Sequence, residues 1–184
     1  MLKTNQITNQ VTGQVFRFLQ TSADTNGKVL EMETVYAPFS DEPPLHYHPQ
    51  QNEYFKVLAG ELTVRLNNEI KSYKPGAVIH IKPGIRHSMW NAGIIETVVN
   101  WKVEPALDTE HFLKVMTALA NGGHTNNKGI PPLPQMIYIL KKHNKSFRLA
   151  KPKTGVIGTL YVLLKPVFAL CSYKKKFKKV LNAA

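Results

Sequence analysis

Short apolar runs separated by turn residues constrain the fold of residues 11–101 more than any other feature of the sequence. Five runs are rich in Val, Ile, Phe, Tyr and Thr, the residue types that favour strands: VFRFL, KVLEMETVY, NEYFKVLAG, ELTVRL and AVIHI. Turn pairs separate them, and Asn67-Asn68 predicts a two-residue hairpin because Asn tolerates positive φ. Closely spaced short strands are typical of a sandwich or barrel, and the lack of long helical stretches here excludes βαβ units.

After Trp101 the apolar spacing changes to that of helices. Asp108 is a candidate N-cap and Gly122 a candidate C-terminal stop for a helix whose apolar stripe comprises Phe112, Leu113, Met116, Leu119 and Ala120. Two or three helical pieces are predicted further on, in QMIYILKKH and GTLYVLLKPVFALC. We therefore expect a mainly β fold with two parts, a barrel domain over residues 1–105 and a basic, apolar-rich helical extension over residues 106–184.

The positive charge of the chain lies almost entirely in this extension. The net charge is +12, and Glu110 is the last acidic residue. Residues 111–184 carry 14 Lys and Arg and no Asp or Glu, whereas residues 1–110 hold 24 − 14 = 10 basic residues against 12 acidic ones. Three interpretations remain open: the helices pack on the barrel or across a dimer, residues 151–179 contact an anionic membrane surface, or the basic tail binds nucleic acid. The lack of a recognisable DNA or RNA module disfavours the last.

The apolar stretch, the single cysteine and the N-terminus together predict where the protein is found in the cell. The apolar stretch 155–171 is interrupted by Lys165-Pro166, which excludes a single transmembrane helix. Cys171 has no partner for an internal disulfide, and the N-terminus lacks the apolar core of a secretory signal. We expect a cytoplasmic protein, with peripheral membrane contact as the alternative that the extension leaves open.

The stretch HYHPQQNEYFKVLAG, residues 46–60, has the pattern of a metal site. His46 and His48 are two positions apart, so on a strand they point to the same face. Glu53 has the wrong parity for an unbroken strand, but Pro49 predicts a turn or bulge that returns it to the side of the histidines. His87, beyond the Pro83-Gly84 turn, is the best candidate for a fourth ligand.

These residues resemble the two motifs of the cupin superfamily. His46, His48, Glu53 and Gly60 fit the first motif, H-x-H-x4-E-x6-G. GAVIHIKPGIRHSMWN resembles the second, with its matching positions at Gly76, Gly84, His87 and Asn91. Two positions depart from the pattern without touching a ligand: Ser40 replaces a glycine and Lys82 a proline.

The resemblance implies an antiparallel jelly-roll barrel that holds one divalent metal through His46, His48, Glu53 and His87. Three imidazoles and a carboxylate suit Fe, Mn, Ni, Co, Cu or Zn. It also implies a homodimer, with the segment GQVFRFL as a candidate for strand exchange. The function is then a metal site open to a small oxygenated substrate, with dioxygenase-like or isomerase chemistry and Glu53 as a candidate proton acceptor. The alternative is a non-catalytic small-ligand binder whose extension contacts a membrane or partner, and the residues leave open whether the protein is an enzyme.

Other side chains are assigned by their position along the strands. The candidate substrate-pocket residues share a face with Glu53 or lie near His87: Phe55, Val57, Met89, Asn91 and Trp101. His80 alternates along AVIHI and is expected at the surface rather than as a ligand. The histidines of the extension, at positions 111, 124 and 143, are expected to be solvated.

Overall fold

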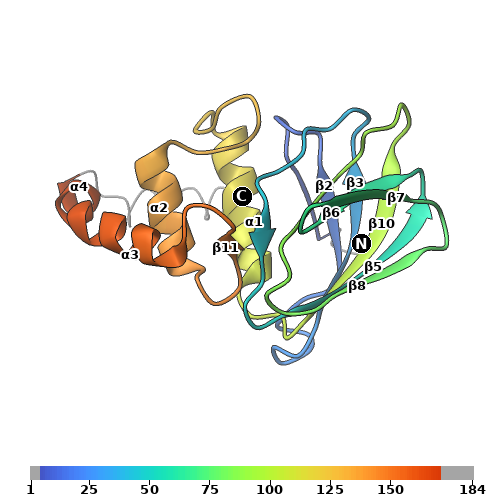
Figure 1. Cartoon of the computed structure of the whole chain (residues 1–184), viewed down its shortest axis with the longest axis horizontal. Coiled ribbons are helices and arrows are strands. Elements are labelled where there is room, and N and C mark those ends of the chain that lie inside the picture. Colours follow the sequence, from blue (N-terminus) through green and yellow to red (C-terminus); the bar gives the residue numbers. More distant parts are fainter. Residues whose placement is uncertain (1–4, 171–184) are drawn as a thin grey trace.

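The computed structural model, which describes residues 5–170, contains two antiparallel sheets and a group of helices to one side of them (Figure 1). Cys171 and the lysines at 174–179 lie outside the described residues. The six-stranded sheet has the order β1 (Gln6–Thr8), β2 (Val15–Gln20), β3 (Leu30–Tyr36), β10 (Thr97–Glu104), β5 (Asn52–Ala59), β8 (Val78–Ile81). The five-stranded sheet has the order β11 (Arg148–Leu149), β4 (His46–Tyr47), β9 (His87–Trp90), β6 (Leu62–Leu66), β7 (Glu69–Tyr73). The predicted mainly β, antiparallel jelly roll is confirmed.

The core fills the space between the sheets because the strands alternate buried and exposed residues. Along β5, Glu53, Phe55 and Val57 are buried while Lys56 is exposed. Apolar side chains of both sheets, such as Val57 from β5 and Val64 from β6, meet in one cluster. Since burial of such a side chain contributes about 1.5–3 kcal/mol, this alternation fixes which face of β5 points inward.

The hairpin predicted at Asn67-Asn68 is confirmed. It joins β6 to β7 with Leu66 opposite Glu69, and Asn67 has a φ of 53°. Strand β6 of this hairpin also pairs with β9, where Leu66 lies opposite His87.

Four helices follow the barrel: α1 (Thr109–Asn121), α2 (Leu133–Lys142), α3 (Thr154–Leu163) and α4 (Lys165–Leu170). In Figure 1, α1 stands next to the sheets and α3 and α4 lie farthest from them. Asp108 occupies the N-cap position, but its side chain does not cap α1; the carboxylate lies 2.8 Å from Nδ1 of His143, at the end of α2. His143 is 2% exposed, so the expectation that it is solvated was wrong.

The chain returns to the barrel after α2. Strand β11 pairs with β4, opposing Arg148 to Tyr47 and Leu149 to His46. Ala150 N–H also donates to the Leu45 carbonyl at 2.8 Å. Residues from the predicted extension thus complete the five-stranded sheet beside the strand that carries His46. No helix within residues 5–170 has both the length and the hydropathy needed to cross a membrane.

Candidate metal centre

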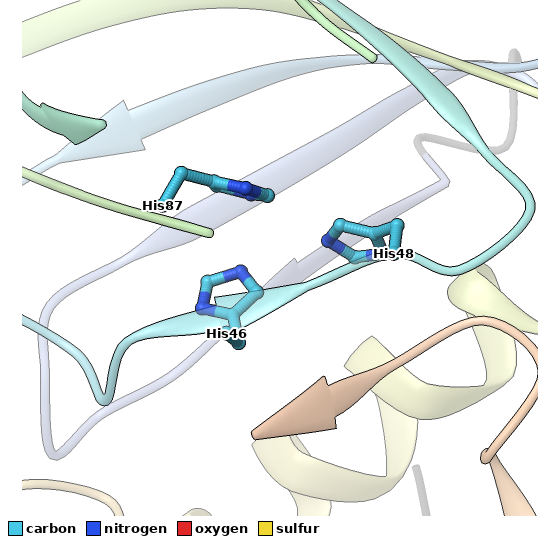
Figure 2. Close-up of side chains that lie close together, drawn as sticks. All are labelled: His46, His48 and His87. Atoms are coloured by element: carbon cyan, nitrogen blue, oxygen red, sulfur yellow. The ribbon is translucent and has the colours of Figure 1, made fainter. Parts of the chain in front are cut away.

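Three histidines converge inside the mouth of the barrel (Figure 2). His46 on β4 lies directly opposite His87 on β9, and their ring centroids are 4.5 Å apart. His48, two residues after His46, brings its ring centroid within 5.4 Å of His46 and 5.3 Å of His87. One nitrogen of each ring lies within 4.8 Å of those of the others, so the three are positioned to bind a metal ion.

Glu53 reaches the histidines from the facing sheet. Its Oε1 lies 3.3 Å from Nε2 of His48, and its Oε2 lies 3.0 Å from Nε2 of His87. Between His48 and Asn52 the chain crosses from the five-stranded to the six-stranded sheet, so Glu53 faces the histidines across the gap. The interruption after Pro49 is present, and it changes sheet as well as parity. Trp101 of β10 donates from Nε1 to Glu53 Oε1 at 3.1 Å and so holds the carboxylate in place.

Backbone carbonyls fix the tautomer of all three imidazoles. Nδ1 of His46 lies 2.9 Å from the Pro44 oxygen, Nδ1 of His87 lies 3.0 Å from the Ile85 oxygen, and Nδ1 of His48 contacts the Ser146 oxygen. A carbonyl can only accept, so each Nδ1 carries the proton and each Nε2 keeps its lone pair. Outer hydrogen bonds of this kind are common to metal-binding histidines.

The buried polar atoms that remain fit a cation between the rings. Nε2 of His48 and Oε2 of Glu53 are buried without a hydrogen-bond partner. His48 Nε2 lies 3.3 Å from Glu53 Oε1, and Glu53 Oε2 lies 3.0 Å from His87 Nε2, but neither atom makes a hydrogen bond. Unsatisfied buried groups are costly, typically about 1–3 kcal/mol each. A bound metal ion would satisfy them together.

The electrostatics keep most of the donors in the form that a metal needs. Burial, aided by the other two rings, holds the pKa of His46 well below 6.5, and burial lowers the pKa of His48 despite the opposing charge of Glu53. Burial raises the pKa of Glu53, but the imidazoles and Trp101 outweigh it, so the net shift is downward. Burial likewise opposes charge on His87, yet contact with Glu53 raises its pKa overall.

Residues after α2 support the site, and sequence reasoning missed them. The Ser146 carbonyl accepts from His48, and the ring of Phe147 stacks on His46 with centroids 4.7 Å apart. Gln51, also missed, is 1% exposed and donates to Thr109 at the start of α1. No local pattern marks these residues, because their role depends on contacts between segments that are far apart in the chain, 58 positions for Gln51 and Thr109 and 98 for His48 and Ser146.

A cavity of about 380 Å³ opens onto the four residues. Of the candidate pocket residues, Phe55, Met89 and Trp101 line it. Val57 and Asn91 are fully buried elsewhere: Val57 packs in the core, and Asn91 donates to the carbonyls of Tyr36 and Ile95. His80 is exposed and pairs with Asn52 Oδ1 at 2.9 Å, as expected of a surface histidine.

Parts of the chain are similar to known proteins. A family model described as Cupin domain matches residues 32–99. The chain is 34% identical to the oxidoreductase iacF of Pestalotiopsis fici over 116 residues, which is 60% of this chain and 56% of that protein. An oxidoreductase of Arthrobotrys oligospora is 45% identical over 51 residues, or 27% of this chain and 20% of that protein. The chain thus spans about half, or less, of the length of these relatives.

Among solved structures, the chain is similar to a predicted oxalate decarboxylase of Thermotoga maritima. The two share 23% identity and a TM-score of 0.48, over 55% of this chain and 90% of that one.

Proposed function

Because this chain belongs to the cupin superfamily, we propose that it is a metal-dependent oxidoreductase acting on a small oxygenated organic substrate. His46, His48, His87 and Glu53 would hold one divalent ion. The observation that carries the proposal is the convergence of three Nδ1-protonated imidazoles and a carboxylate at one end of a cavity. The oxidoreductase names of the two relatives support the reaction class.

Each residue has a distinct part in this proposal. A bound metal supplies Lewis acidity, or redox chemistry if it is Fe, Mn or Cu. The backbone carbonyls orient the imidazoles, and Trp101 orients Glu53. Glu53 lines the cavity and its Oε2 lacks a hydrogen bond, so it is also the group placed to accept a proton from a substrate hydroxyl. A non-catalytic ligand binder would use the same four residues but would not turn over substrate.

Elemental analysis of the full chain, purified without a histidine tag, tests the proposal first. We expect close to one equivalent of Fe, Mn, Ni, Co, Cu or Zn in the wild type, and its loss in His87→Ala. The control is His80→Ala, which removes an exposed histidine from the surface and should retain the metal. A wild-type protein that is empty and takes up none of these metals when they are added would overturn the proposal.

Glu53→Gln tests whether Glu53 is itself a metal ligand or only supports the histidines. The amide keeps the shape but loses the negative charge and the lone pairs of one oxygen. If Glu53 is a ligand, metal affinity falls by more than the roughly 10–100-fold typical of an outer-shell change. An unchanged affinity would remove Glu53 from the proposed ligand set.

We further propose that the outer face of α3 and α4 contacts an anionic membrane surface. Helix α3 exposes Val156, Val162 and Leu163 by 49%, 57% and 68%, beside the exposed lysines at 153 and 165. Apolar side chains flanked by lysines are typical of helices that lie in a membrane interface. A homodimer and a cytoplasmic location stay predictions; the GQVFRFL segment lies largely in β2, which is paired within the chain to both β1 and β3.

A further inference from the structure

The cavity beside the candidate metal centre has two walls of different origin. The barrel contributes Phe16, Phe55 and Trp101, from strands β2, β5 and β10. The helical part contributes Phe112 and Met116 from α1, and Phe147 just before β11. The predicted extension therefore helps to shape the space in which any ligand of the metal must lie.

Aromatic side chains of the cavity wall contact the candidate metal ligands directly. Phe147 stacks on His46, and it also stacks on Phe112 with ring centroids 4.5 Å apart. Across the cavity, Trp101 donates to Glu53 and stacks on Phe55 with ring centroids 5.4 Å apart. A ligand bound through the metal would thus pass directly from polar contacts to aromatic faces.

The charged residues around the cavity are already paired. Lys128 is the single Lys or Arg among the described residues that line it, and its Nζ lies 3.0 Å from Asp41. Glu42 is held by Arg65 at 2.7 Å and by Ser88. A phosphate is typically bound by an unpaired cation, and the lining offers no Lys or Arg without an acidic partner among the described residues; its other donors are neutral side chains such as Gln14 and Asn127.

We propose that the substrate is an uncharged or weakly acidic compound with a compact apolar ring system and two adjacent oxygens. The oxygens, hydroxyl or keto, bind at the metal end, while the rings lie against Phe112, Met116 and Phe147. A volume of about 380 Å³ is at the small end of ligand pockets and suits a bicyclic molecule rather than a long chain. This inference rests on the proposed function, since it needs the open metal site.

A pair of hydroxamic acids tests the inference, because both chelate through the same two oxygens and differ only in the apolar body. Acetohydroxamic acid carries a methyl group and 2-naphthohydroxamic acid carries two fused rings. Dissociation constants are measured on the full chain loaded with Co(II), from the change in its visible absorption. We expect the naphthyl compound to bind at least about tenfold tighter, since it buries far more apolar surface.

Variants assign the preference to the helical wall. Met116→Gln should weaken naphthohydroxamate binding about tenfold and leave acetohydroxamate within about twofold. Phe147→Ala also removes the ring stacked on His46, so it should weaken both compounds, and naphthohydroxamate by the larger factor. Met116→Gln nearly preserves the length of the side chain and changes none of the candidate ligands. It therefore still tests the role of the helical wall if Phe147→Ala does not fold. Leu133→Ala is the control, because Leu133 is 64% exposed on α2 and does not line the cavity.

The outcomes separate this inference from the proposed function. If neither hydroxamate changes the Co(II) spectrum, the open metal site is wrong and both proposals fall. If both bind with equal affinity, or if the variants weaken both alike, the metal site stands and the apolar-substrate inference is overturned.

Discussion

Gly60 occupies a position that no other residue can take without strain. Its φ is +71°, and a methyl group added there would meet the Glu96 carbonyl and lie 2.8 Å from Thr97 Cα. We expect Gly60→Ala to lower the free energy of unfolding by roughly 2–4 kcal/mol, from backbone strain and overpacking together. Gly27→Ala is the matched control: its φ is +78° but nothing lies within 4 Å, so only about 1 kcal/mol should be lost. Equal losses in urea unfolding would show that close packing at Gly60 contributes nothing.

At the same scale, the sequence predicts the convergence of the four candidate ligands better than it predicts the lining of the cavity. The histidines, Glu53 and Gly60 stand at spacings that a turn and two strands impose, so a local pattern is enough to find them. Parity placed Phe55 and Val57 on the inward face, but it cannot say how far along the strand the cavity extends. The cavity lies at the Glu53 end of β5, so Phe55 lines it and Val57 does not.

The junction between α1 and α2 depends on one carboxylate. Burial raises the pKa of Asp108, but contacts with His143 and Ser146 outweigh it, so its pKa lies below the ordinary 3.8. A carboxyl with a lowered folded pKa stabilises the fold above the unfolded pKa, and this stability is lost as pH falls through the folded pKa. Because the side chain is 41% exposed, we expect Asp108→Asn to cost no more than about 1 kcal/mol at pH 7.

The pH dependence distinguishes this interaction from a change in packing. The difference between wild type and Asp108→Asn should shrink below about pH 4 and vanish at lower pH, where both side chains are neutral. Urea unfolding across this range is the measurement. Asp41→Asn, which breaks an exposed pair with Lys128, should change stability by less than about 0.5 kcal/mol at any pH. A loss in Asp108→Asn that is constant with pH would contradict the assignment.

Among the elements, β11 shows where sequence reasoning stops. The surrounding strands and α1 have periodic apolar patterns of their own, and they were predicted close to where the structure has them. Strand β11 has two residues, Arg148 and Leu149, and is defined only by its pairing with Tyr47 and His46. A strand this short exists because a distant partner offers hydrogen bonds, and nothing in the residues around it indicates that partner.

For the whole molecule, the boundary predicted near residue 105 separates two parts of different sequence character, but it does not separate the candidate metal centre from the helices. The charge and the apolar periodicity change there, which supports two parts. The cavity, however, is lined from both sides of that boundary, and the Ser146 carbonyl orients His48 across it. Whether the two parts are separate domains stays a prediction, but the candidate metal centre needs both.

The same asymmetry leads to a prediction about surfaces. Residues 111–184 contain 14 Lys and Arg and no Asp or Glu. On α3, Val162 and Leu163 are both more than half exposed. Each Lys near an anionic membrane contributes about 1 kcal/mol, and a buried Leu about 1.5–3 kcal/mol. We expect the full chain to sediment with vesicles of phosphatidylserine and phosphatidylcholine far more than with pure phosphatidylcholine. About 1 M salt should release it, since the Debye length there is about 3 Å.

One pair of variants locates the contact. Leu163→Ser should weaken vesicle binding about tenfold, whereas Ile94→Ser should leave it within about twofold, because Ile94 is 77% exposed but lies on the barrel. If both variants bind like the wild type, the charge acts without insertion of α3, and the proposed apolar contact is wrong. If the wild type ignores anionic vesicles at low salt, membrane contact is excluded and the lysines are a solvated face. Neither result would bear on the candidate metal centre, because it uses none of these residues.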